Sequence, residues 1–349
     1  MKKRYSIDLE YIKELKELMV MCNSDQLDID RITNLIDRLS NGFNQDETND
    51  TLSNIRSNSE YYTDFKELYK AIRLFVSRGI FIDSIPEPSY KEMIISDDDS
   101  ITLAHDFYKE QGNFFLDGFN DFKSDMNDHL EFIEPNDYTD GEIHFYKSSG
   151  DAFIFTPDHK NFTKVSILIH ELEHVIDCFN NHDFYENLLI REISAVFMEM
   201  IGLDYLANVF KLEDAHYIRR FTLHSIVKSD AYNAYYKNQL LYLTNKYKDL
   251  DDQKLRKLLV SKFGMSNGFI NFCNSYNLYQ DYYYQLAQLV SIELYKIYNN
   301  DKEKALFVLK DIIMNGTDDN IFNILKKHNI VLVSNVVNYE NDMCLKLGI

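Results

Sequence analysis

The chain has 349 residues, 45% hydrophobic and 27% charged, which is enough for a large core in one or two domains. Its 56 acidic and 37 basic residues give a net charge of −19, which argues against nucleic acid or an anionic membrane as the main partner. The four cysteines are scattered without metal-type pairs, the chain begins without an apolar leader, and no run of about 18 apolar residues occurs. We therefore expect a cytoplasmic protein with reduced thiols.

The scarcity of helix-breaking residues, 4 prolines and 11 glycines, together with long stretches of 3.6-residue periodicity, predicts a mainly α-helical protein. Amphipathic helices are expected over 4–22, 28–39 and 61–78, before a break at Pro86 and Pro88. These helices carry no recognisable chemistry. We predict an N-terminal helical wall or lid over residues 1–95 and a second domain over 96–349.

Residues 97–129 read as helix, with Gly112 and Gly118 as interruptions. After turn-forming residues at 134–141, the segments 142–146 and 151–156 are expected to form a small β-strand pair. His144 and His159 fall in this region, and a lone histidine beside a strand is more often structural than functional.

The strongest signal is the H-E-x-x-H pattern formed by His170, Glu171 and His174. Residues i and i+4 lie above one another on a helix, so both imidazoles can reach one metal ion. Glu171 would flank the ion instead of binding it, and could take a proton from a zinc-activated water.

The surrounding segment is expected to be a helix with Thr163 as its N-cap. Its apolar residues gather on one side and its polar residues on the other, the latter being His170, His174, Asp177 and Cys178. Two interpretations of Asp177 stay open, a hydrogen bond to a metal-binding group or an ordinary helix-surface acid. Cys178 is expected to be a small buried thiol.

Two histidines leave a catalytic zinc short of one protein ligand. The next segment, 183–210, is predicted to be helical and largely buried, and it carries Glu192 and Glu199 two turns apart on one face. Glu192 follows His170 by 22 residues, which suits a ligand from a second helix packed on the first. Buried carboxylates need partners, and a metal site supplies one.

These residues resemble a known family. The segment from Glu192 to Glu199, E-I-S-A-V-F-M-E, is similar to the E-x-A-S-T-x-x-E segment of the thimet oligopeptidase and oligoendopeptidase F zinc peptidases. The tyrosine-rich stretch 279–289 resembles the tyrosine helix of that family, and 305–332 its C-terminal helix–glycine–helix ending. The similarity spans residues 96–349 in family order.

The resemblance implies a helical, zincin-like (gluzincin) catalytic domain over 96–349 that binds one zinc ion. It implies that His170, His174 and Glu192 bind the zinc and that Glu171 activates the water. It further implies that Glu199 orients a histidine, that Tyr284 hydrogen-bonds the oxyanion, and that Tyr282 contacts substrate.

The chain also departs from the family. The family has Gly where Glu173 stands and a third histidine where Asp177 stands, and the histidine that precedes its tyrosine helix is replaced near Tyr276 or Asn277. The N-terminal region is reduced. A shorter N-terminal region would leave the cleft more open, or the site would be completed by a second subunit in a homodimer.

We expect a zinc-dependent metallo-oligoendopeptidase that hydrolyses internal bonds of short peptides, with Glu171 as general base. The expected partners are peptide substrates, with neither nucleic acid nor membrane. Two alternatives stay open: a catalytically impaired zinc protein that binds peptides, and a protease dedicated to one protein target.

Overall fold

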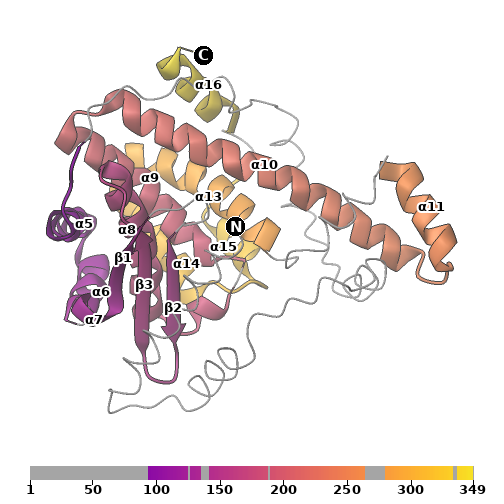
Figure 1. Cartoon of the computed structure of the whole chain (residues 1–349), viewed down its shortest axis with the longest axis horizontal. Coiled ribbons are helices and arrows are strands. Elements are labelled where there is room, and N and C mark those ends of the chain that lie inside the picture. Colours follow the sequence, from indigo (N-terminus) through magenta and orange to yellow (C-terminus); the bar gives the residue numbers. More distant parts are fainter. Residues whose placement is uncertain are drawn as a thin grey trace.

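The computed structural model describes residues 93–124, 126–134, 141–187, 189–263, 280–332 and 336–348, apart from some side chains within its helices. The helices predicted over 4–22, 28–39 and 61–78 lie outside the described residues, so the proposed domain division stays a prediction. The described part is mainly helical, with one small sheet (Figure 1).

The region predicted as one interrupted helix contains α5 (Asp97–Gln111), α6 (Asn113–Lys123) and α7 (Met126–His129). Gly112 separates α5 from α6 with a φ of 100°, a conformation that side chains disfavour. Gly118 was expected to interrupt as well, and that prediction is wrong. Gly118 lies inside α6, and its lack of a side chain lets Ile176 of helix α8 (Phe162–Asn180) approach closely.

The sheet has three strands in the order β1 (Leu130–Ile133), β3 (Asp151–Pro157) and β2 (Glu142–Tyr146). β2 and β3 form the antiparallel pair predicted from the sequence. The short strand β1 was not predicted, and it pairs with β3 in parallel. β2 therefore lies at an edge of the described sheet, beside helix α8 (Phe162–Asn180).

Helix α8 begins two residues earlier than it would with Thr163 as its N-cap, so that prediction is wrong. The N-cap is Asn161, whose side-chain oxygen accepts a hydrogen bond from the Thr163 backbone N–H. α8 is buried along most of its length, including residues that its sequence pattern placed on a polar face. The segment after it is not continuous helix, because a 3₁₀ turn, η2 (Phe184–Glu186), precedes α9 (Arg191–Phe210).

Helix α9 packs between α8 and α13 (Gln280–Asn300) at the centre of the molecule. It is long and apolar enough to cross a membrane by composition, but here it is the core helix of the fold. Glu192 and Glu199 are therefore carried by an element that is covered on two sides.

The remaining helices are α10 (Glu213–Lys246), α11 (Asp252–Phe263), α14 (Lys302–Asn315), α15 (Ile321–Lys327) and α16 (Val336–Leu347). The long helix α10 crosses the body and carries α11 at the end that projects from it (Figure 1). The predicted helix–glycine–helix ending is present, because Gly316 caps α14 shortly before α15 begins.

Candidate metal centre

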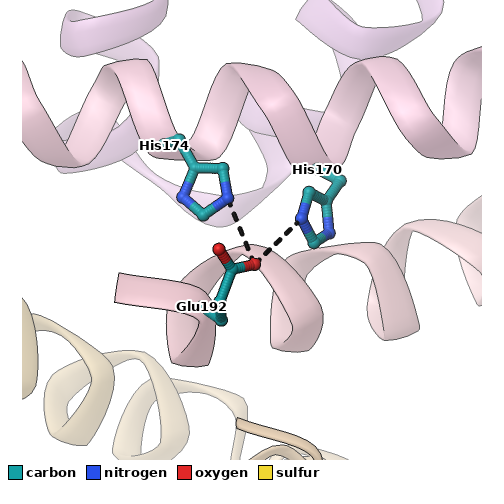
Figure 2. Close-up of side chains that lie close together, drawn as sticks. All are labelled: His170, His174 and Glu192. Atoms are coloured by element: carbon teal, nitrogen blue, oxygen red, sulfur yellow. Dashed lines mark ion pairs between the residues drawn. The ribbon is translucent and has the colours of Figure 1, made fainter. Parts of the chain in front are cut away.

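Three side chains converge between α8 and α9. Glu192 Oε2 lies 3.3 Å from His170 Nε2 and 3.4 Å from His174 Nε2 (Figure 2). All three candidate ligand atoms lie within 4.8 Å of one another. The histidines come from successive turns of α8, and Glu192 comes from the first turn of α9.

Glu199 supports this cluster from one side. Its Oε2 lies 3.2 Å from His170 Nδ1, on the side of the ring that faces away from Glu192. Its Oε1 accepts hydrogen bonds from the Ser166 hydroxyl at 2.7 Å and from Arg219 of α10 at 3.3 Å. The structure thus places Glu199 where it can fix the orientation of a candidate ligand histidine.

Arg191 supports Glu192 in a comparable way. Its Nε lies 3.5 Å from Glu192 Oε1, while the guanidinium lies over the Tyr185 ring, 5.5 Å from the ring centre. The two oxygens of Glu192 therefore face different groups, one the histidines and the other an arginine.

Burial and charge act against each other in this cluster. Burial alone lowers the pKa of His170, but its contacts with Glu192 and Glu199 outweigh burial and raise that pKa well above the usual value. Burial would raise the pKa of Glu192, but both histidines outweigh it and hold that pKa well below the usual range. Burial lowers the pKa of His174. Glu192 is therefore ionised at neutral pH, the form in which a carboxylate binds metal.

Glu171 lies beside the cluster without joining it. It is buried, and burial is the largest cause that raises the pKa of its carboxyl to about 8, with further increases from Glu192 and Glu199 and an opposing effect of His170. A β-carbon at residue 141 would overlap this carboxyl, so glycine there lets the carboxyl keep its present position.

The cluster opens into a cavity of about 600 Å³. Along one side lies the edge strand β2, and the other described walls include Tyr185, Arg191 and Tyr284. Tyr284, which is 36% exposed, lines this cavity, and its role toward the oxyanion stays a prediction. The side chain of Tyr282 lies outside the described residues.

A larger cavity, of about 1520 Å³, lies where α9 ends and α10 begins. Among the described residues, only His170, His174 and Glu192 form a cluster with metal-binding geometry. The smaller cavity is therefore the candidate site.

The neighbouring polar residues of α8 are not on the surface. Asp177 is fully buried and accepts a hydrogen bond from Ser194 of α9, so its interpretation as a helix-surface acid is wrong. Glu173 is also fully buried, beside Tyr108 and Asp177. Cys178 is a buried thiol, as predicted, and does not belong to the candidate ligand set.

Several residues of the site were not predicted. Ser166 lies one turn before His170 and could have been found by extending the helical face toward Glu199. Gly141, Tyr185 and Arg191 gave no sequence signal, and neither did Arg219, which reaches Glu199 from α10.

The donor set fits a divalent metal. Two imidazoles and a carboxylate are the ligands that catalytic zinc uses in gluzincins, with a further position for water or substrate. Glu192 Oε2 is buried, and its contacts with the two histidine nitrogens fall short of hydrogen-bond geometry, so a cation bound between the three groups would satisfy it.

No protein-family model matches the sequence, and no curated protein matches it. Among solved structures, a complex of PZ peptidase A with inhibitor 2 has a TM-score of 0.52 at 12% identity, over 99% of this chain and 67% of that chain. A protein provisionally assigned as an oligoendopeptidase F from Bacillus anthracis str. Ames has a TM-score of 0.50 at 15% identity, over 92% of this chain. A provisionally assigned peptidase from Chlamydophila abortus has a TM-score of 0.53 at 13% identity, over 85% of this chain.

This chain spans 64% of the Bacillus anthracis structure and 54% of the Chlamydophila abortus structure. At such low identity the likeness concerns the fold alone. The chain therefore has the fold of the oligoendopeptidase F peptidases, as its sequence motifs predicted.

Proposed function

We propose that this protein is a zinc-dependent metallopeptidase that hydrolyses internal bonds of short oligopeptides. The observation that carries the proposal is the meeting of His170, His174 and Glu192 within 4.8 Å, with Glu171 beside them in a cavity bordered by an edge strand. The peptidase folds of the structural neighbours support it.

In this proposal His170, His174 and Glu192 hold the zinc ion, and Glu199 keeps the His170 ring in place. When bound, zinc supplies positive charge that polarises the scissile carbonyl and favours ionisation of the attacking water and of Glu171. In the metal-free protein burial is the largest cause that raises the pKa of Glu171 to about 8, and the opposing effect of His170 does not offset it. The charge of a bound zinc ion would lower that pKa.

Glu171 then acts as the base. Its carboxylate accepts a proton from the attacking water and later donates that proton to the nitrogen of the leaving amine. Its burial removes competing water, and Gly141 leaves the carboxyl room to face the cavity.

The walls of the cavity suit a peptide in extended conformation. The backbone of β2 can pair with it as an added strand, and Tyr284 can donate a hydrogen bond to the developing oxyanion. The proposal includes a cytoplasmic location, no membrane or nucleic-acid partner, and a homodimer as one arrangement; the acidic composition supports the exclusion of nucleic acid.

The test is cleavage of a mixed set of quenched-fluorescent peptides by zinc-loaded wild type and by Glu171→Gln. We expect cleavage by the wild type and a loss of at least about 100-fold in the variant, with equal zinc content in both. Near-normal turnover by Glu171→Gln would contradict the mechanism. Zinc binding without cleavage of any peptide would point instead to a peptide-binding protein or to a protease with a single protein target.

A further inference from the structure

Polar contacts join α8 and α9 along their whole interface. From one end to the other, these contacts, called here the α8–α9 ladder, are Ser166–Glu199, His170–Glu199, His170–Glu192, His174–Glu192 and Asp177–Ser194. Residue numbers rise on α8 while they fall on α9 for most of the ladder, so the two helices run antiparallel. On α8 the two candidate ligand histidines lie between Ser166 and Asp177, and on α9 Glu192 lies at the start of the helix.

On α8 the Asp177–Ser194 contact lies beyond the ligand histidines, while on α9 Ser194 lies between Glu192 and Glu199. Ser194 Oγ donates to Asp177 Oδ2, and both residues are fully buried. Ser194 follows Glu192 by two residues, and Asp177 follows His174 by three. A hydrogen bond in so dry an environment resists competition from water, so it can hold the two helices in one relative position.

The Ser194 contact lies close to the first turn of α9, which carries a candidate ligand. The N-cap, Ile190, makes no side-chain capping hydrogen bond, and the start of the helix is held by backbone hydrogen bonds and by Asp318, which accepts from the backbone N–H of Leu189. The first turn of a helix lacks part of its internal hydrogen bonding and frays most readily. Glu192 lies in that turn.

Replacing either residue alone would leave the other polar group buried without this partner, which is costly. The two buried side chains are therefore expected to act as a pair.

We propose that the Ser194–Asp177 hydrogen bond is a positioning device that sets the register of α9 on α8 and thereby brings Glu192 to His170 and His174. This inference rests on the proposed function, because it assumes that these three residues bind zinc. Its consequence is that breaking a bond outside the ligand set weakens zinc binding.

The experiment measures the zinc dissociation constant of the full chain by competition with a chromogenic chelator. We expect Ser194→Ala and Asp177→Ala each to weaken zinc binding about 10-fold, the lower end of what loss of supporting contacts costs at metal sites. Asp177→Asn keeps an oxygen that accepts from Ser194, and should bind zinc nearly as tightly as the wild type. The double variant should lose little more than either single alanine variant, because one interaction is removed in all three.

The matched control is Ser100→Ala. Ser100 is another fully buried helical serine, and its hydroxyl donates to Ser96 O at 2.7 Å, away from α9. It should leave zinc affinity unchanged. Ser194→Ala deletes a single oxygen, so it carries the test even where Asp177→Ala folds poorly.

Three outcomes would overturn the inference. If Ser194→Ala melts at a lower temperature but binds zinc like the wild type, the bond has a structural role only. If Ser100→Ala weakens zinc binding equally, the effect is not specific to the ladder. If the wild type binds no zinc at all, the proposed function fails and this inference fails with it.

Discussion

Gly141 lies against the carboxyl group of Glu171, so closely that a β-carbon at residue 141 would overlap it. Gly141 directly precedes the edge strand β2, while Glu171 belongs to α8. A side chain at residue 141, next to the sheet edge, would therefore displace the proposed base, Glu171.

Gly141→Ala should accordingly impair catalysis without affecting metal binding. Displacing Glu171 by about 1 Å costs roughly 100-fold in kcat/KM, while His170, His174 and Glu192 stay in place. Peptide hydrolysis and zinc content, measured on the same preparation, check this. Ser148→Ala, in the exposed turn after β2, is the control and should keep full activity. Full activity of Gly141→Ala would show that Glu171 can move without loss.

Zinc removal should destabilise the protein, because the folded state binds the ion and the unfolded state lacks the assembled site. At free zinc of 100 times the dissociation constant, we expect about 2.7 kcal/mol of added stability over the metal-free protein. Thermal unfolding with and without a chelator measures the effect. His174→Ala should show no such difference, and an equal response of that variant would place the zinc elsewhere.

Glu173→Met should stabilise the protein. Glu173 is fully buried, and neither carboxyl oxygen meets hydrogen-bond geometry with a described residue, although Tyr108 and Asp177 lie close enough to affect its pKa. Replacing such a group with an apolar side chain of similar size removes a cost of about 1–3 kcal/mol. Denaturant unfolding at pH 7 checks this, and a destabilised variant would mean that the carboxyl has a favourable partner in solution.

Asp204 links α9 to α10 and α13. It accepts hydrogen bonds from Arg220 and from the Tyr295 hydroxyl, both at 2.6 Å. Burial would raise the pKa of Asp204, but His216, Arg220 and Tyr295 outweigh it and lower that pKa from 3.8 to about 2. A lowered folded-state pKa stabilises the protein above the unfolded-state pKa, and this stabilisation is lost as the pH falls toward 2.

We therefore expect Asp204→Asn to cost about 1–2 kcal/mol at pH 7, a value reduced because the side chain is partly exposed. The difference from the wild type should shrink between pH 4 and pH 2. Urea unfolding of both proteins across this range measures it. A difference independent of pH would mean that ionisation of Asp204 does not contribute.

Much of the site could be predicted because its signals are local. The four-residue spacing of His170 and His174 defines one helix face, and a buried glutamate on the next helix implies a partner. The strands β2 and β3 could be predicted for the same reason, because the residues that pair are close in sequence.

The rest depends on contacts between segments that sequence patterns do not connect. The two interpretations of Asp177, a hydrogen bond to a metal-binding group or a surface acid, both missed its partner because that residue, Ser194, lies on another helix. The four-residue strand β1 forms only through parallel pairing with β3. For the N-cap of α8, Asn161 and Thr163 are both suitable residue types, and the hydrogen bond to the Thr163 N–H decides between them.

The candidate ligands are also close along the chain, since Glu192 follows His170 by only 22 residues. A segment this short loses little entropy when its ends are brought together. Zinc would therefore tie a local pair of helices instead of distant parts of the chain. During synthesis, α8 and α9 emerge well before α13, the helix that later covers α9. An ion captured at that stage would hold the pair together while the rest of the core is still being made.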